Sequence, residues 1–177
     1  MHSKSLEKSF MFRQMRRKNQ ELLKSECDEI LLKGKTGTLA VVGDEDYPYA
    51  VPLNYIYLED KIYFHCAKEG HKIDSIKKND KVSFCVVEKD EVVPEVFGTD
   101  FRSVIVFGRA RFLAEDEIMS AIQKFTKKYC PKASEGAIQS EINKDFKRLC
   151  MVEIKIKHMT GKQAIEFVRK ANQETSL

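Results

Sequence analysis

Apolar and polar residues alternate along this chain in two rhythms, one typical of helices and one of strands. Over residues 115–129 the apolar side chains recur every three or four positions, which predicts an amphipathic helix. Residues 149–157 alternate strictly, which predicts a strand with one buried face and one face in water. The expected core face of this strand holds Val152, Ile154 and Ile156, and the expected water face holds Glu153, Lys155 and Lys157.

The rest of the pattern predicts further strands and short helices, with turn formers between them. The first three strands are expected to form a meander, with turns at 43–46 and at Glu59-Asp60. These three strands are predicted over 37–42, 49–58 and 61–66, and two more over 82–87 and 103–113, before the strand over 149–157. The additional helices are predicted over 25–33, 71–78 and 138–146.

Local signals refine this outline. Ser25 and Asp28 have the spacing of a capping box at the start of the first helix. The polar stretch 88–100 contains a proline and a glycine and is expected to be a mobile loop. Gly108 lies inside a predicted strand, where either a bulge that curves a barrel or ordinary strand variation explains it. The tail after Ala171 is expected to be disordered.

Together these elements predict a mainly β, α+β barrel of antiparallel strands with flanking helices. The chain has 177 residues, which suits one domain, and 42% of them are hydrophobic and 33% charged, as in a soluble globular protein. It has neither an apolar run long enough to span a membrane nor the apolar centre of a secretory signal. We therefore expect a cytoplasmic protein that does not enter the membrane.

Charge and cysteine content exclude several kinds of site. The five cysteines are scattered, odd in number and without a Cys-x-x-Cys pair, so we expect reduced thiols. The four histidines lack zinc-site spacing, and no phosphate-loop, dinucleotide-binding or nucleophile-elbow motif occurs. The net charge is only +4 and basic residues are interspersed with acidic ones, so no nucleic-acid partner is expected. A basic cluster over 13–18 either attracts phosphate or forms a solvated helix face.

The stretch 64–72, Phe-His-Cys-Ala-Lys-Glu-Gly-His-Lys, combines a strand end, a glycine turn and a helix start. Unpaired backbone N–H groups at a helix start favour an anion, and Lys68 and Lys72 add positive charge. Gly70 permits a close backbone approach, and His71 offers a further donor. The stretch is either a phosphate-binding turn or a basic surface turn.

A weaker candidate lies in the segment 51–55, Val-Pro-Leu-Asn-Tyr. Asn54 offers a donor and an acceptor suited to a flavin ring or its ribityl chain. Pro52 suggests an edge or bulge position, because proline cannot donate to a ladder. Ser103 either places its hydroxyl near the same ligand or is a solvated serine at a strand start.

Taken together, the segments 46–55, 62–72, 81–87 and 103–108 resemble the nitroimidazole-resistance branch of the pyridoxamine-phosphate-oxidase-like proteins. The similarity spans most of residues 13–162. It implies a flavin-binding split β-barrel over 13–165, with a flexible N-terminus over 1–12 and a C-terminal tail over 166–177. It also implies a homodimer with flavin mononucleotide (FMN), or flavin adenine dinucleotide (FAD), at the subunit interface.

Carried over position by position, the resemblance implies a set of cofactor contacts. The flavin ring and ribityl chain would lie against Pro52, Leu53, Asn54, Tyr55, His65, Cys66 and Ala67. The phosphate would be held by Lys68, His71, Lys72 and Ser103, with Arg16 and Arg17 from the basic start of the chain. No residue is assigned as catalytic, because the flavin itself carries the redox chemistry.

The implied activity is that of a flavin-dependent oxidoreductase with a small-molecule electron acceptor, and some relatives reduce 5-nitroimidazole compounds. True pyridoxamine-phosphate oxidation is not expected, since the chain has no tryptophan and lacks the arginine-rich C-terminal signature. A non-enzymatic flavin- or haem-binding protein, with His65 or His71 as a haem ligand, is the alternative. A basic scaffold with an empty barrel is a third reading.

Overall fold

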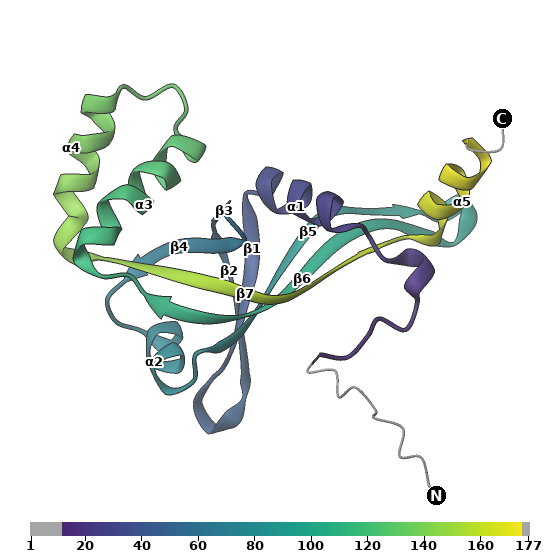
Figure 1. Ribbon diagram of the computed structural model, residues 1–177, viewed down its shortest axis with the longest axis horizontal. Coiled ribbons are helices and arrows are strands. Elements are labelled where there is room, and N and C mark those ends of the chain that lie inside the picture. Colours follow the sequence, from purple (N-terminus) through teal and green to yellow (C-terminus); the bar gives the residue numbers. More distant parts are fainter. Residues whose placement is uncertain (1–11, 175–177) are drawn as a thin grey trace, which may run out of the picture.

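The computed structural model describes residues 12–174 as one antiparallel sheet with five α-helices around it (Figure 1). The strands are β1 (Thr36–Val42), β2 (Pro48–Asn54), β3 (Ile56–Leu58), β4 (Lys61–Ala67), β5 (Lys81–Val93), β6 (Gly98–Phe112) and β7 (Leu149–Gln163). The helices are α1 (Lys24–Lys33), α2 (His71–Lys78), α3 (Glu115–Tyr129), α4 (Glu135–Asp145) and α5 (Ile165–Glu174). Short 3₁₀ turns cover Lys18–Gln20, Asp44–Asp46, Pro94–Val96 and Phe146–Arg148. The mainly β, antiparallel class predicted from the sequence is confirmed.

The strand order explains why the sheet curls. It runs β2-β1-β5-β6-β7-β4-β3, so β2 and β3 form its two opposite edges. Only Tyr55 separates these strands along the chain, and the two edges must therefore lie close together. The result is a barrel that is split rather than closed, because β2 pairs with β1 while β3 pairs with β4.

The expected three-strand meander is wrong at this point. The segment 49–58, predicted as one strand, changes partners at Tyr55 and becomes two strands. The two predicted turns are confirmed: the 3₁₀ turn Asp44–Asp46 joins β1 to β2, and Glu59-Asp60 joins β3 to β4. Both residues of the second turn have positive φ angles, as a tight hairpin turn requires.

Gly108 marks the bend of β6. Phe107 pairs with His158 and Gly108 with Ile156, so a bulge is present beside Gly108, with Lys157 of β7 as its extra residue. A Cβ atom at Gly108 would lie 2.6 Å from Cγ2 of Ile154 and 2.7 Å from the carbonyl oxygen of Lys155. Only glycine therefore allows β7 to approach this closely where the sheet curves.

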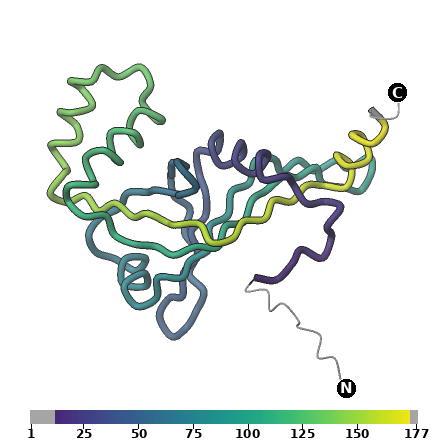
Figure 2. Tube along the Cα trace, viewed as in Figure 1, coloured from purple at the N-terminus to yellow at the C-terminus, as the bar shows by residue number. Residues whose placement is uncertain are grey.

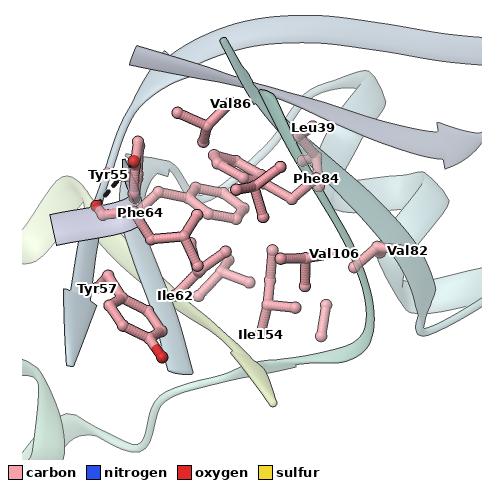
Figure 3. Packing of buried hydrophobic residues seen from close by; sticks show 14 of the residues in the cluster. Leu39, Tyr55, Tyr57, Ile62, Phe64, Val82, Phe84, Val86, Val106 and Ile154 are labelled. Carbon is pink, nitrogen blue, oxygen red and sulfur yellow. Dashed lines mark hydrogen bonds between the residues drawn. The ribbon is translucent and has the colours of Figure 1, made fainter. Parts of the chain in front are cut away.

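The interior of the curled sheet is the main core (Figure 3). Side chains from six strands meet there, and α1 adds Cys27, Ile30 and Leu31. Phe64 on β4 and Phe84 on β5 are both at most 1% exposed. The strand predictions over 37–42, 61–66 and 82–87 lie within β1, β4 and β5 and are confirmed.

Helices α3 and α4 cover part of the outer face, over β3, β4 and the first half of β7 (Figure 1). Ile118, Ile122 and Phe125 pack there against Ile56 and Met151 in a second cluster. The helices predicted over 115–129 and 71–78 are confirmed with the same bounds. The one predicted over 138–146 begins three residues earlier, at Glu135.

Two segments expected to lack regular structure are ordered. The predicted mobile loop 88–100 continues β5 and β6 as a long hairpin that projects beyond the barrel (Figure 2). The tail expected to be disordered after Ala171 is helical through Glu174. The flexible segment predicted over 1–12 lies outside the described residues apart from Phe12.

Two side-chain predictions are also corrected. The first helix begins earlier than expected, with Leu23 at the N-cap, and its backbone N–H donates to Glu26 at 2.8 Å, so Ser25 is not the cap. Glu153 points to the outer face as predicted by the alternation, yet it is only 4% exposed. Arg111, Lys61 and Tyr63 surround its carboxylate, so it is buried by partners rather than solvated.

Candidate functional site

The end of β4 forms one wall of a pocket of about 450 Å³, and α3 and α4 form the other. His65 and Ala67 point to the outer face, where these helices lie, while Cys66 packs at the edge of the barrel core. This pocket, called here the β4 pocket, brings together three residues that the sequence assigned to the flavin wall. Its size lies within the range typical of small-molecule sites.

The imidazole of His65 lies edge-on to the ring of Phe125, with centroids 4.7 Å apart and planes at 89°. Burial lowers the pKa of His65, because the charged imidazolium loses solvation there. The ring is therefore neutral at physiological pH and presents an uncharged, polar edge to the pocket.

Asn54 is connected to the β4 pocket through Tyr129. The Tyr129 hydroxyl lines the pocket, and the Asn54 side chain hydrogen-bonds to it. The same hydroxyl accepts a hydrogen bond from the backbone N–H of Tyr55 at 3.0 Å. The end of β2 and the end of β4 therefore meet at one place on the seam of the split barrel.

Tyr55 and Leu53 take a different position from the one implied for ligand contacts. Tyr55 is fully buried, and its hydroxyl donates to the carbonyl oxygen of Leu31 at 2.8 Å. Leu53 points inward against the main core, whereas Pro52 and Asn54 point outward and are exposed. Of the β2 residues implied as ligand contacts, Pro52 and Asn54 are therefore the ones whose side chains can reach an external ligand within one chain.

The turn after β4 has the features of an anion site. Gly70 has a φ angle of 121°, and a Cβ atom built there would meet nothing within 4 Å, so the space beside its backbone is open. Gly70 is the N-cap of α2, and no side chain caps this helix start. The first N–H groups of the helix are thus free to donate to an anion. Lys72 lies near enough to Cys66 that its charge counteracts the rise in that thiol's pKa.

The other two basic residues of this turn point elsewhere. The His71 ring stacks on Tyr49 with centroids 4.1 Å apart, and its Nε2 lies 3.8 Å from Asp44. Lys68 lines a different pocket, together with Cys150 of β7. Lys68 therefore lines the neighbouring pocket, whereas Lys72 lines neither pocket and is connected to the β4 pocket only through its charge acting on Cys66.

Cys66 and Cys150 lie directly opposite each other on β4 and β7, and their thiols hydrogen-bond. Burial raises the pKa of Cys66 to about 11 and also raises that of Cys150. All five cysteines are free, in agreement with the expected reduced thiols.

Ser103 and Arg16 lie away from the β4 pocket. Ser103 is in the middle of β6, on the outer face, between Val87 and Lys162. Arg16 is exposed in the N-terminal segment, which runs on the other side of the β1–β2 hairpin from α2 (Figure 1). Arg17 bonds only to nearby Gln20, at 3.5 Å. One chain alone does not bring these residues together with Lys72.

Within residues 12–174 no α-helix covers the outer face of β2, β1, β5, β6 and the second half of β7, which carries exposed apolar side chains among polar ones. Phe12 of the N-terminal segment lies against Phe107 and His158 at one end of it. The strand register places Pro52, Thr38, Cys85 and Ile105 side by side on successive strands. Ile105 and Phe107 are 42% and 38% exposed, and Val87 is 57% exposed. Pro52, Asn54 and Ser103 all belong to this surface, which is called here the open face.

The lining of the β4 pocket that comes from α3, α4 and the start of β7 was not anticipated, and Phe125, Tyr129 and Arg148 are its members most relevant to a ligand. The 3.6-residue periodicity placed Phe125 and Tyr129 on a buried helix face but could not show which part of the sheet that face covers. Nothing in the local sequence singles out Arg148. No group of three or more metal-ligating side chains occurs within residues 12–174, and no described helix is long and apolar enough to cross a bilayer.

Comparison with known proteins agrees with this architecture. A family model described as pyridoxamine 5′-phosphate oxidase matches residues 24–163. No curated protein sequence matches the chain.

Several solved structures share the fold. A candidate 5-nitroimidazole antibiotic resistance protein from Bacteroides thetaiotaomicron superposes with a TM-score of 0.65 at 22% identity, over 81% of this chain and 86% of that one. An FAD-binding protein from Mesorhizobium loti superposes with a TM-score of 0.60 at 24% identity, over 82% of this chain and 97% of that one. An FAD- and haem-binding protein from Mycobacterium smegmatis superposes with a TM-score of 0.66 at 15% identity, over 82% of this chain and 73% of that one. At these identities the similarity establishes the split-barrel fold.

Proposed function

Because the chain belongs to the pyridoxamine 5′-phosphate oxidase family, we propose that it binds a flavin nucleotide and acts as a flavin-dependent oxidoreductase. One observation carries the proposal: the outward residues of β2 and β4 converge at the barrel seam, beside an uncapped helix start. Asn54 lies on one side of this seam, His65 and Ala67 on the other, and Gly70 follows directly. Two of the neighbouring structures described above are FAD-binding proteins, which supports a flavin as the ligand.

The residues present fit the two chemical parts of a flavin nucleotide. The open space beside Gly70, the free N–H groups of α2 and the charge of Lys72 suit a phosphate. The β4 pocket, with the neutral His65 edge and the aromatic rings of Phe125 and Tyr129, suits a planar, largely apolar ring. FMN has both parts, and FAD shares them.

When bound, a flavin supplies hydride and electron transfer, so the chain itself need only bind and orient it. Asn54 and the Tyr129 hydroxyl can donate to or accept from the polar edge of the ring. His65 is exposed, but its partial desolvation beside Phe125 lowers its pKa, so the neutral ring lines the pocket without adding charge. The acceptor we propose is a small aromatic molecule, with 5-nitroimidazoles as the compounds to test first.

We further propose that two copies pair through the open face. Contiguous apolar surface on a soluble protein marks an interaction site, and a two-fold pair would place Ser103 and Arg16 of one copy near the seam of the other. The phosphate set implied by the resemblance would then be completed by the partner. This pairing accounts for residues that a single chain keeps apart.

The test is the ligand released from purified protein. Mass spectrometry after denaturation is expected to identify FMN or FAD, and addition of a reduced nicotinamide with a nitroimidazole is expected to oxidise the nicotinamide. Protein that carries no flavin and binds none on reconstitution would overturn the proposal.

A second candidate is haem binding, and one observation favours it: His65 is held neutral in the β4 pocket, the form that ligates iron. One neighbouring structure binds haem as well as FAD. Reconstitution with haem followed by visible spectroscopy separates the candidates, because loss of the haem spectrum in His65→Ala would support ligation by this residue.

A further inference from the structure

A second pocket, of about 410 Å³, lies beyond the end of β4, next to the β4 pocket. It opens between α2, the start of α3 and the 3₁₀ turn Phe146–Arg148. Its floor is apolar and is formed by Ile73, Phe112, Leu113, Ile118, Phe146 and Leu149. We call it the lysine pocket.

Three lysines surround this apolar floor: Lys68, Lys77 and Lys147. They come from three separate elements, the β4–α2 turn, helix α2 and the 3₁₀ turn before β7. Within residues 12–174 none of the three has an ion-pair or hydrogen-bond partner. Glu115 is the single acidic residue that lines the pocket.

Lysines elsewhere in the described chain are both paired and unpaired, so what distinguishes these three is that they gather around one apolar pocket. Lys24, Lys61 and Lys89 each contact a carboxylate, at 2.8, 3.1 and 3.0 Å. Like charges gathered near a low-dielectric surface attract an anion more strongly than isolated surface charges do. Their influence reaches the wall of the pocket, where the charges of Lys68 and Lys77 counteract the rise in the pKa of Cys150.

We propose that the lysine pocket binds a small amphipathic organic anion, a molecule with an apolar body and one acidic group. The apolar body would lie on the floor between Ile118 and Phe146, and the acidic group would lie among the three lysines at the rim. An apolar cavity with a few convergent polar groups is the usual form of a small-molecule site, and this volume suits a single ring system or a short acyl chain.

The lysine pocket adjoins the β4 pocket but has its own lining. Leu149 lines both pockets, whereas Cys66 lines only the β4 pocket and Cys150, its partner on β7, lines only the lysine pocket. The proposal therefore holds whether or not the chain carries a flavin, and the two can fail independently.

Calorimetric titration tests the proposal with four probes: 2-naphthoate, octanoate, and their neutral counterparts 2-naphthamide and octanamide. We expect saturable binding of at least one carboxylate, weakened by added salt, and clearly weaker binding of its amide. The carboxylate that binds identifies the body as aromatic or aliphatic. Equal binding of acid and amide, or no binding of either acid, would overturn the proposal.

Variants test whether the lysines are responsible. The double variant Lys77→Glu with Lys147→Glu is expected to weaken carboxylate binding by about fivefold or more, since it replaces attraction with repulsion at the pocket rim. The control variant Lys170→Glu makes a single Lys→Glu change on α5, at the far end of the molecule. It is expected to bind the carboxylate with an affinity within about twofold of that of wild type. A double variant that folds, as judged by its circular dichroism, and binds like wild type would contradict the assignment.

Thiol protection locates the bound anion in wild-type protein and needs no variant. Cys150 lines the lysine pocket, and Cys130 lines the β4 pocket. Saturating carboxylate is expected to slow the alkylation of Cys150 several-fold, measured by mass spectrometry of tryptic peptides, and to leave that of Cys130 unchanged. Protection of Cys130 alone would move the anion to the β4 pocket and overturn the proposal.

Discussion

The hydroxyl of Tyr129 on α3 lies 2.7 Å from the carbonyl oxygen of Tyr55, the residue at which the chain passes from one edge of the sheet to the other. It also accepts the backbone N–H of Tyr55 at 3.0 Å and lies 2.6 Å from the carbonyl oxygen of Lys35. Tyr55 belongs to no strand, so its backbone groups have no ladder partner there. Tyr129, together with the Lys128 ammonium that donates to the same Tyr55 carbonyl oxygen at 3.2 Å, therefore satisfies the point where the barrel is split, and Tyr129 also lines the β4 pocket.

We predict that Tyr129→Phe lowers the free energy of unfolding by about 1–3 kcal/mol, because it leaves backbone groups near the seam without a partner. Urea denaturation measures the change. Tyr47→Phe is the matched control, since Tyr47 is 76% exposed, and it is expected to change stability by less than about 0.5 kcal/mol. Equal stability of the two variants would show that Tyr129 does not secure the seam.

The buried carboxylate of Glu153 gives a prediction about acid. Burial alone would raise its pKa, but hydrogen bonds from Arg111, Lys61 and Tyr63 outweigh this and hold the pKa below its usual value. The Arg111 guanidinium and the backbone N–H of Ala114 likewise lower the pKa of Glu117 from 4.5 to about 2. A carboxyl with a lowered folded-state pKa binds more protons when the chain is unfolded. Stability is therefore expected to be full above about pH 4.5 and to fall as the pH drops towards 2.

Glu153→Gln tests this account. We expect it to destabilise the protein by about 1–3 kcal/mol at neutral pH, through the loss of charge-assisted hydrogen bonds, and to flatten the acid dependence. Asp116→Asn, an exposed change on α3, is the control and should leave both properties unchanged. An acid profile in Glu153→Gln that matches that of wild type would refute the role given to Glu153.

Two glycines offer a paired test of close packing. Gly108→Ala is expected to destabilise by about 1–3 kcal/mol, because its Cβ would overlap Ile154 and the backbone of Lys155. Gly136→Ala, in α4 with nothing within 4 Å of the added Cβ, is expected to stabilise by about 0.5–1 kcal/mol. Thermal unfolding of both variants measures the contrast in stability. If both variants were stabilised, or both destabilised, close packing at the bulge would not explain the effect of Gly108→Ala.

Local sequence patterns predicted much of this fold. The helices over 71–78 and 115–129 were predicted with the right bounds, since the first is bounded by Gly70 and Asn79 and the second has a strong helical periodicity. The Gly108 bulge was predicted as one of two readings. In contrast, strand 49–58 was not divided at Tyr55, because the change of partner depends on which edges meet and not on residues near Tyr55.

The same limit applies to the site. The turn over 64–72 was located correctly because a glycine between a strand and a helix is a local signal. That Lys68 lines a second pocket and Lys72 lines neither was not predictable, since it depends on where α3 and β7 lie. Glu153 was placed in water because alternation reports the face of a strand and not what covers that face. Phe125 and Tyr129 were missed as site residues for the same reason.

The phosphate assignment predicts an effect of Lys72. Lys72→Ala is expected to weaken flavin binding about tenfold or more, because a hydrogen bond to a charged group contributes about 1.5–3 kcal/mol. Quenching of flavin fluorescence measures the affinity. Lys132→Ala, an exposed change in the loop between α3 and α4, should have no effect, and an equally small effect of Lys72→Ala would remove Lys72 from the site.

The open face predicts the oligomeric state. Ile105→Arg with Phe107→Arg is expected to convert a dimer into monomers in analytical ultracentrifugation, because charges would be buried between the two copies. Flavin binding is expected to weaken with it, since the partner's Ser103 and Arg16 would be lost from the site. A wild-type monomer that binds flavin at full strength would refute pairing while leaving the flavin proposal intact.

The central claim is that the seam between β2 and β4, with the Gly70 turn beside it, holds a flavin nucleotide. Titration of apoprotein into FMN or FAD, followed by flavin fluorescence, tests it most directly. The account predicts saturable quenching at one flavin per chain, weakened in Lys72→Ala and in Asn54→Ala but not in Lys132→Ala. The absence of saturable quenching with either flavin would contradict it.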